Sequence, residues 1–403
     1  MPSTKSMKLL DHWLGLPLTL VTAVLSRLFG GRRNPIAHLP HHIVVSKYFG
    51  LGSIILSLPL LQALHRAYPQ AHITMVTFAS HQKFLSRLGI IDEFWPIRTD
   101  NLWYFIVDTL YNVFRHIVTP IDVYIDLEFY SKYATLFTFL SGAGQKIGFY
   151  YPSFWRKSHY SHPIFFNFAK HILDNYGMFA SAVGAKITPG TNPSFKPLPS
   201  SVEKLRGIIN NALGAEGPLV GVNINASDLA LGRRWLRNRF IALIWRMVEE
   251  LGCRIVLTGI EEEREYTTEC YNILPANIQR HTLNLAGELS LEEFFAALSI
   301  MDLLVTNDSG PVHFAFALGT PTVSIWGPGD PYNYGPRGPR HSHIYLSYPC
   351  SPCMYIYRTE VGYFCEEQFS CVQTITVDDV YNQVKKMLAK IKSKPERKPR
   401  SRA

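Results

Sequence analysis

The feature that most constrains the fold is an alternation of short hydrophobic segments with helical ones. Residues 41–47 (HHIVVSK) predict a buried strand, and a glycine-containing turn at 48–53 leads into a helix expected over about 54–68. Further strands are expected at 71–78, 121–127 and 145–149, with helical stretches between them. This alternation predicts an α/β fold whose parallel sheet is covered by helices on both faces.

The alternation occurs twice. A proline- and glycine-rich stretch at 186–217 interrupts it, and we interpret this stretch as an interdomain connection with an entry helix. The second series has strands at 219–224, 254–258, 301–306 and 321–326, and helices at 239–251, 261–274 and 377–391, with one more capped by Ser290 and Glu293. The predicted domains are 1–38, 39–195, 196–375 and 376–403. Two similar α/β units predict ligand binding in a cleft between them.

The composition is globular and basic. Of the 403 residues 47% are hydrophobic and 18% charged, which is enough apolar material for two packed cores. The net charge of +9 suits an anionic partner such as a nucleotide sugar, a phosphorylated glycolipid or a membrane surface. Residues 385–402 contain nine Lys and Arg and one acidic residue, Glu396. This segment is either a solvated tail or a segment that is attracted to anionic lipids. Without a DNA- or RNA-binding motif, nucleic acid is not an expected partner.

An uncharged run of 14 residues lies near the N-terminus, at 13–26. It is too short to span the roughly 30 Å of hydrocarbon in a bilayer. It is flanked by Lys5 and Lys8 before it and by Arg27, Arg32 and Arg33 after it. Three interpretations stay open: an amphipathic helix on a membrane surface, a helix packed on the protein's own domain, and an uncleaved signal-like segment.

Residues 301–336 carry the clearest chemistry. A hydrophobic strand brings Asn307 and Asp308 to the carboxyl edge of a sheet, and a helix begins near Ser309 with Pro311 in its first turn. Backbone N–H groups at such a start can hold a diphosphate, and Gly310 lets the backbone approach it closely. His313, one turn on, is expected to point toward the same edge, where an imidazole can donate to a phosphate oxygen. Taken singly, these residues read equally well as helix caps and an ordinary helical histidine.

This segment resembles the signature of glycosyltransferase family 9, the ADP-heptose:lipopolysaccharide heptosyltransferases. The resemblance extends to residues 43–69, 218–259 and 285–289, and covers about 40–392. It implies a GT-B fold, in which two Rossmann-like domains face each other across a cleft. It also implies an inverting transfer from a nucleotide sugar, expected to be ADP-heptose, to a lipopolysaccharide or related glycolipid. The expected location is the cytoplasm, peripherally at the inner membrane.

The resemblance also assigns donor-binding residues. It implies that Asp308, Ser309, Gly310 and His313 hold the donor diphosphate and sugar. It further implies phosphate or ribose contacts from Ala226, Ser227, Arg233 and one of Glu261 to Glu263, for which we choose Glu262. The family usually has lysine where Arg233 stands, which keeps the charge and changes the geometry. A cation there can neutralise a leaving diphosphate, and no DxD-type motif is visible, so no metal or other cofactor is expected for catalysis.

One departure from the family concerns the general base. After the first strand the family usually carries Gly-Asp, whereas this chain has Gly52-Ser53, with Gly50 in the same acceptor-side loop. Serine cannot accept a proton unaided at neutral pH. Three outcomes follow: another carboxylate acts (Glu128 first, then Asp126), little base help is needed, or heptose is not transferred. The simpler interpretations are a surface carboxylate for Glu128 and a helix N-cap for Ser53.

Four cysteines cluster near the C-terminus: Cys350, Cys353, Cys365 and Cys371. Their number and spacing are typical of a structural zinc site, and an iron–sulfur cluster is less favoured. Free thiols and disulfides stay open as alternatives. We expect a structural clip here and no catalytic role.

Together these features predict a glycosyltransferase. Two alternatives are kept: a nucleotide-sugar-binding protein with weak or no transferase activity, suggested by Ser53, and a nucleotide-sugar epimerase of the same GT-B fold.

Overall fold

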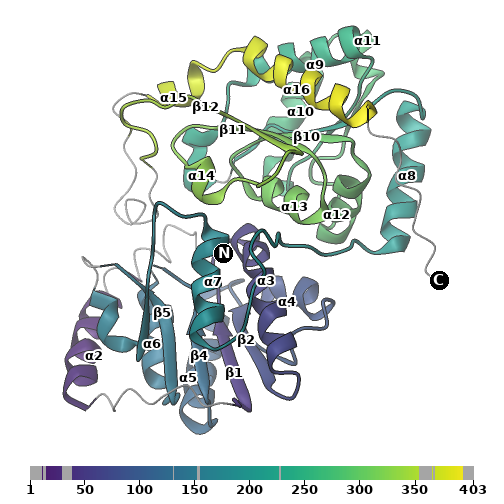
Figure 1. Cartoon of the computed structure of the whole chain (residues 1–403). Coiled ribbons are helices and arrows are strands. Elements are labelled where there is room, and N and C mark those ends of the chain that lie inside the picture. Colours follow the sequence, from purple (N-terminus) through teal and green to yellow (C-terminus); the bar gives the residue numbers. More distant parts are fainter. Residues whose placement is uncertain are drawn as a thin grey trace. The chain divides into compact units, whose positions relative to one another are not determined.

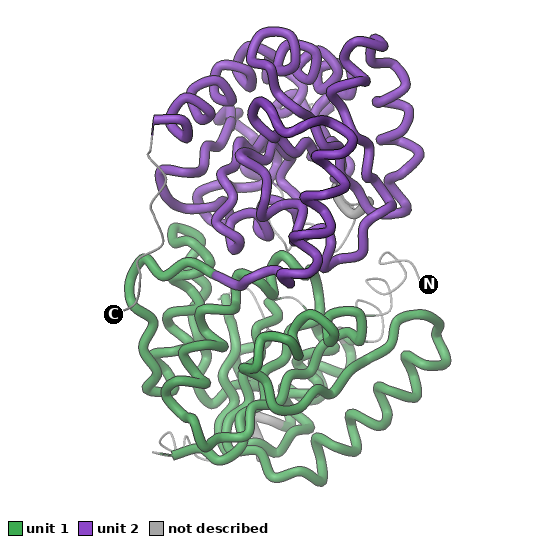
Figure 2. The backbone as a smooth tube through the Cα atoms, turned by 90° about the vertical axis from the view of Figure 1, so that its right-hand side faces the viewer, with its two compact units in different colours: residues 1–193, 356–362 green, residues 194–355, 363–403 purple. Residues whose placement is uncertain are grey.

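The computed structural model describes residues 11, 15–29, 39–129, 131–151, 155–226, 228–353, 365 and 368–393. These residues form two compact units, one up to Pro193 and one from Ser194 onward (Figure 2). The sequence placed the boundary between residues 195 and 196. The predicted segment 1–38 and the tail beyond Ser393 lie largely outside the described residues.

Unit 1 contains a six-stranded parallel sheet in the order β3-β2-β1-β4-β5-β6 (Figure 1). Its strands are β1 (His42–Ser46), β2 (His72–Phe78), β3 (Glu93–Ile97), β4 (Val123–Asp126), β5 (Gln145–Tyr150) and β6 (His162–Phe165). The helices are α2 (Gly15–Phe29), α3 (Leu51–Ala67), α4 (Ala79–Ser86), α5 (Leu102–Val118), α6 (Lys132–Leu140), the 3-10 helix η1 (Trp155–His159) and α7 (Ile172–Ala182). The parallel strands are joined by crossover connections, and the central strands β1 and β4 are buried on both faces.

Unit 2 repeats this plan in the order β12-β11-β10-β7-β8-β9. Its strands are β7 (Leu219–Asn223), β8 (Arg254–Leu257), β9 (Thr282–Asn284), β10 (Leu303–Asn307), β11 (Thr322–Trp326) and β12 (His341–Tyr345). The helices are α8 (Pro199–Leu213), η2 (Asp228–Arg233), α9 (Arg237–Leu251), η3 (Glu261–Glu263), α10 (Arg264–Ile273), α11 (Ala276–Gln279), α12 (Leu291–Ile300), α13 (Gly310–Leu318), α14 (Pro331–Tyr334), α15 (Ser370–Gln373) and α16 (Val377–Lys392).

The two sheets share one topology, which predicts where a ligand would bind. In each unit the strand order reverses next to the first strand, between β1 and β4 and between β7 and β10. Ligands of such sheets bind beyond the carboxyl ends of the strands at this reversal. The predicted α/β class with two Rossmann-like units is confirmed.

Local sequence signals explain several helix ends. The predicted capping box forms at the start of α12, where Ser290 accepts a hydrogen bond from the Glu293 N–H and Glu293 accepts one from the Ser290 N–H. Gly319 ends α13 in the left-handed conformation, with φ of 76°. The main core of unit 2 packs α9 and α16 against β7, with Phe240 and Val384 fully buried.

A buried histidine makes unit 1 sensitive to acid. His116 of α5 is fully buried and its ring packs against Trp95 and Phe137. Burial lowers the pKa of His116 to about 4, against 6.5 for an ordinary histidine. Between these values the unfolded chain takes up a proton that the folded chain does not. The free energy of unfolding should therefore fall as the pH drops from 6.5 toward 4.

Denaturant titrations at several pH values between 7 and 4 test this expectation. His116→Gln should give a shallower pH dependence in this window than the wild type. His281→Gln, at an exposed position in unit 2, is the matched control and should leave the slope unchanged. An identical slope for wild type and His116→Gln would contradict the assignment to His116.

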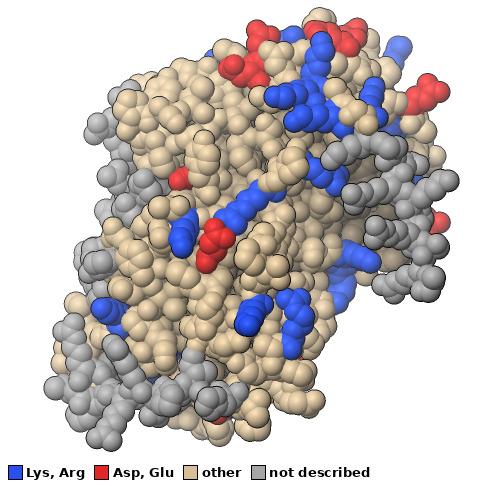
Figure 3. Space-filling model, in the orientation of Figure 1, with Lys and Arg blue, Asp and Glu red and all other residues tan. Residues whose placement is uncertain are grey.

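The surface matches the low content of charged residues. Uncharged side chains cover most of the face drawn in Figure 3, and the charged ones stand in separate groups. Among the described helices, none has the length and apolar character needed to cross a membrane.

Candidate functional site

In unit 2, a buried asparagine joins the two strands at the reversal of strand order. Asn307 ends β10 and is fully buried. Its Nδ2 donates to the carbonyl oxygens of Ile224 and Asn225, both at 3.1 Å, in the segment after β7. Its Oδ1 accepts from the Trp235 N–H at 3.0 Å, just after η2. Asn307 therefore fixes three segments at one edge of the sheet, all within the predicted donor site.

The next residue, a buried aspartate, forms an ion pair with a half-buried arginine. Asp308 is 5% exposed, and its Oδ2 lies 3.3 Å from Nε of Arg233. Arg233 Nη1 also donates to the Asp308 carbonyl oxygen at 3.4 Å. Burial raises the pKa of Asp308, and the Arg233 charge opposes that rise. The structure thus brings together two residues that are 75 positions apart in the sequence and were both predicted to hold the donor.

The second glycine loop of this motif packs on the same carboxylate. A Cβ atom at Gly329, in the loop between β11 and α14, would lie 2.1 Å from Asp308 Oδ2. Only glycine fits there without displacing Asp308. The loop is closed by Asp330, whose side chain accepts from the Tyr332 N–H at 2.8 Å.

Helix α13 begins beside this pair, as predicted. Ser309 is its N-cap, Gly310 its first residue, and Pro311 lies in the first turn. The Ser309 side chain makes no capping bond, and its hydroxyl donates to the Asn307 carbonyl oxygen at 3.3 Å. Pro311 has no N–H, and the Val312 N–H donates to the Ser309 carbonyl oxygen at 3.2 Å. The Gly310 N–H is therefore the first-turn donor that we expect to reach an anion. His313 lies in the same turn and is half-buried.

The other predicted donor contacts fall at the ends of the neighbouring strands. Ala226 follows β7 and is buried, and Ser227 lies outside the described residues. In η3, Glu261 pairs with Arg264 at 2.9 Å and Glu263 accepts from the Ile260 N–H at 3.0 Å. Glu262 is exposed and makes no such bond within the described residues, so it is the one of the three available to a ligand.

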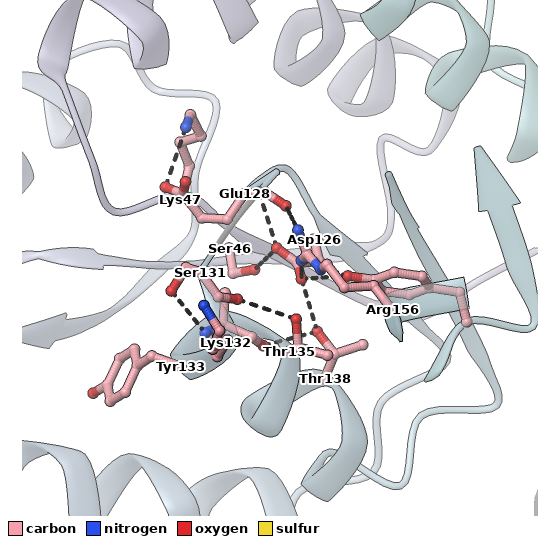
Figure 4. Close-up of polar contacts among 12 residues, drawn as sticks. Ser46, Lys47, Asp126, Glu128, Ser131, Lys132, Tyr133, Thr135, Thr138 and Arg156 are labelled. Atoms are coloured by element: carbon pink, nitrogen blue, oxygen red, sulfur yellow. Dashed lines mark hydrogen bonds and ion pairs between the residues drawn. The ribbon is translucent and has the colours of Figure 1, made fainter. Parts of the chain in front are cut away.

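In unit 1, Glu128 holds the turn after β1 (Figure 4). Its Oε1 accepts from the N–H groups of Tyr48 and Phe49, at 2.6 and 2.9 Å. Lys47 Nζ reaches the same oxygen at 3.1 Å, and both side chains are buried. The interpretation of Glu128 as a plain surface carboxylate is wrong. It lies at the carboxyl edge of the sheet and holds the loop at 48–53, which the sequence predicts to lie on the acceptor side.

Asp126 lies deeper than predicted. It is fully buried and pairs with Nη2 of Arg156 at 2.5 Å, and it also accepts from the Tyr160 hydroxyl at 2.7 Å (Figure 4). Arg156 Nη1 donates to the Glu128 carbonyl oxygen at 2.5 Å. Burial raises the pKa of Asp126, and the Arg156 charge opposes that rise. Asp126 has no exposed surface and is therefore less accessible to an acceptor hydroxyl than Glu128, which is 5% exposed.

Ser53 does not cap helix α3. The N-cap is Gly50, with φ of 75°, and Ser53 lies within the first turn. Its hydroxyl reaches the carbonyl oxygens of Phe49 and Gly50 at 2.7 and 2.8 Å. Gly50 is needed for the left-handed turn, and Gly52 is buried beside it. The predicted N-cap is therefore wrong, because the positive φ that begins the helix falls on the glycine.

Three residues of this edge escaped the sequence analysis. Lys47 and Arg156 hold the two carboxylates, and His81 at the start of α4 is buried with its Nδ1 3.0 Å from the Thr77 hydroxyl. Burial and the nearby Lys47 charge lower the pKa of His81 to about 4. Lys47 directly follows a buried strand, which is a usable signal. Arg156 lies in a 3-10 segment and offered none.

The four predicted cysteines lie near one another. Burial raises the pKa of the Cys371 thiol to about 12, and the charges of Cys353, Cys365 and Cys350 add to this rise. All four are free thiols. Within the described residues, no group of three or more His, Cys, Asp or Glu side chains has an arrangement that could hold a metal ion. The zinc site stays a prediction.

The cysteine group borders the donor site. The Cys353 N–H donates to the Pro328 carbonyl oxygen at 3.1 Å. A Cβ atom at Gly327 would lie 3.0 Å from the Cys371 sulfur. Cys353 and Cys371 therefore pack against the second glycine loop, at residues 327–329.

Known proteins share this sequence and fold. The sequence model of glycosyltransferase family 9 (heptosyltransferase) matches residues 113–363. Lipopolysaccharide heptosyltransferase 2 of Salmonella typhimurium is 33% identical over 120 residues, which span 30% of this chain and 34% of that protein. The matched region thus covers about a third of that relative's length.

Two solved structures are similar over most of their length. E. coli ADP-heptose lps heptosyltransferase II superposes with a TM-score of 0.67 at 20% identity, over 87% of this chain and 99% of that one. The family 9 glycosyl transferase from Veillonella parvula gives a TM-score of 0.69 at 20% identity, over 87% and 97%. This likeness confirms the predicted fold class, GT-B. Because the family match spans more than half of the chain, the protein belongs to glycosyltransferase family 9, the heptosyltransferase family.

Proposed function

We propose that this protein transfers a sugar, heptose from ADP-heptose, to a hydroxyl group of a lipopolysaccharide or related glycolipid, with inversion at the anomeric carbon. The names of the Salmonella and E. coli relatives support this donor and acceptor. We further propose that the protein works in the cytoplasm, peripherally at the inner membrane, where such an acceptor would be presented.

The observation that carries the proposal is the arrangement around Arg233. A guanidinium group and the uncapped first turn of α13 lie together at the carboxyl ends of β7 and β10. Fixed cations and N–H donors stabilise the charge that develops on a leaving diphosphate. In the proposed reaction the acceptor oxygen bonds to the anomeric carbon while the bond from that carbon to the phosphate oxygen breaks. We propose that Arg233 and the Gly310 N–H serve this step without a catalytic metal.

A general base must accept the proton of the acceptor hydroxyl. Of the two predicted carboxylates, Glu128 is the better placed for this role. Its three contacts with Lys47, Tyr48 and Phe49 all reach Oε1, and Oε2 takes part in none of them. We propose that Oε2 accepts the proton of the acceptor hydroxyl.

Replacing Glu128 with glutamine tests this role. Glutamine keeps an oxygen that accepts from Tyr48 and Phe49 and removes the basicity, so kcat should fall by about 100-fold or more. The dissociation constant of the donor, measured by calorimetry, should stay unchanged because the donor site lies in unit 2. A kcat close to that of the wild type would show that the reaction needs no base at this position.

A second candidate function is a nucleotide-sugar-binding protein with weak or no transferase activity. Ser53, Asp126 and Glu128 all make hydrogen bonds or ion pairs within unit 1. This observation favours the second function, because the three side chains then hold the loop at 48–53 and its neighbours in place and need not act as a base. An epimerase of the same fold would modify the nucleotide sugar without any acceptor.

Product analysis separates these functions. The protein is incubated with ADP-heptose, with and without heptose-deficient lipopolysaccharide, and the products are identified by mass spectrometry. Transfer that requires both substrates supports the proposal. Modification of the donor alone would indicate an epimerase, and tight donor binding without product would indicate a binding protein. Thermal-shift measurements with ADP-, UDP-, GDP- and CDP-sugars identify the nucleotide.

A further inference from the structure

Helix α5 has an inverted distribution of polar and apolar residues. Its buried residues are the polar Asn112 and His116. Its outer face carries ten large hydrophobic residues that are 38% to 69% exposed: Leu102, Trp103, Tyr104, Ile106, Val107, Leu110, Tyr111, Phe114, Ile117 and Val118. Its two charged residues are half-buried and paired, Asp108 with Arg98 and Arg115 with Glu93. A soluble helix would normally bury this apolar face.

Helix α2 repeats the inversion. Its inward positions are small, with Gly15, Thr19 and Ala23 buried. Its outward positions are large, and Leu18, Leu20, Val21, Val24 and Leu25 are exposed. Both α2 and α5 pack against α6, so they belong to the same helical layer of unit 1 (Figure 1). Of the 23 exposed large hydrophobic residues in the described structure, 15 lie on these two helices, so the exposure is concentrated on one face.

We infer that the outer faces of α2 and α5 form a membrane-docking surface that inserts into the interface of an anionic phospholipid bilayer. This inference extends the membrane part of the proposed function. Two observations favour a lipid surface over a protein partner, and the first is chemical. Trp103, Tyr104 and Tyr111 lie among the aliphatic residues, and such rings prefer the boundary between head groups and acyl chains.

The second observation is charge complementarity. Residues 1–193 hold 17 Lys and Arg against 9 Asp and Glu, so this part of the chain carries +8 of the total +9. Arg98 and Arg115 border the apolar face of α5, stacked on Tyr104 and Tyr111 respectively. Each also pairs with a carboxylate, so the excess positive charge of this unit comes from its other Lys and Arg residues. Lys5, Lys8, Arg27, Arg32 and Arg33 flank the apolar run of α2 in the sequence. Cations around an apolar face are attracted by anionic head groups while the apolar side chains enter the bilayer.

Vesicle flotation of the full chain tests the inference, with vesicles of equal parts phosphatidylglycerol and phosphatidylethanolamine. The wild type should float with these vesicles and bind phosphatidylcholine vesicles more weakly. The double substitution Leu110→Glu with Phe114→Glu should weaken binding by at least about tenfold, because two side chains no longer insert. Both positions are more than half exposed, so the fold should be kept, which circular dichroism checks.

The matched control is Ile208→Glu with Ile273→Glu, two exposed apolar positions of unit 2, which should leave flotation unchanged. The inference is overturned if the wild type does not float, or if the α5 variant floats as well as the control. A third outcome also overturns it. In that outcome sedimentation shows that the wild type self-associates and the α5 variant does not, while the α5 variant binds vesicles as well as the wild type. The assay contains no donor or acceptor, so its failure is distinct from failure of the transferase proposal.

Discussion

Arg233→Ala is expected to lower kcat/KM for the nucleotide sugar by about 10² to 10³. The guanidinium group lies beside the first turn of α13, where the leaving diphosphate is proposed to bind, and it is paired with the buried Asp308. Its removal takes away the cation that opposes the developing negative charge. Steady-state kinetics with varied donor at saturating acceptor measure the effect.

Two variants sharpen this prediction. Arg233→Lys keeps the charge and matches the residue usual in the family, so its loss should be clearly smaller than that of Arg233→Ala. Arg237→Ala removes a neighbouring arginine that pairs with Glu269 at the surface, and should leave kcat/KM close to that of the wild type. Equal activity of the wild type and Arg233→Ala would remove Arg233 from the donor site.

Arg156→Ala is expected to lower the free energy of unfolding of unit 1 by about 3 to 5 kcal/mol. Asp126 is fully buried, and Arg156 is the cation that pairs with it. Its removal leaves a buried carboxylate without a counter-charge. Urea denaturation followed by circular dichroism measures the loss, and the activity should fall as well because Arg156 also supports Glu128.

Replacing both partners distinguishes a lost ion pair from lost packing. Asp126→Asn with Arg156→Met removes both charges and should recover part of the stability lost in Arg156→Ala. Arg98→Ala breaks a half-exposed pair with Asp108 and should cost about 1 kcal/mol or less. If Arg156→Ala lowers the free energy of unfolding by less than about 1 kcal/mol, the buried pair does not stabilise unit 1.

The central strands of both sheets could be predicted because each is a continuous hydrophobic run. β1, β4, β7 and β10 are of this kind, and they define the reversal points. The strands missed by the sequence analysis are β3, β6, β9 and β12, which lie at or next to sheet edges. β3 contains Pro96, β6 contains Pro163, and β9 has only three residues, so the pattern of a buried strand is too short or too interrupted to detect there.

The candidate site divides in the same way. The predicted donor residues Asp308, Ser309 and Gly310 follow one strand, and the turn from β10 into α13 that they form could be predicted from the sequence. The network of unit 1 joins Ser46, Asp126 and Arg156, which are separated by up to 110 positions, and only the fold brings them together. The many apolar residues of α5 can be seen in the sequence. That these residues face outward is known only from the structure, in which Asn112 and His116 are the buried residues of the helix.

We propose that the diphosphate of the donor binds where α13 begins, at the Gly310 N–H and Arg233. Hydrogen exchange of the full chain, with and without saturating ADP, tests it most directly. We expect slower exchange at residues 308–313 and at the segment after β7, with much smaller changes along β1 and α3. Protection confined to unit 1, or unchanged exchange at 308–313 while ADP is bound, would contradict it.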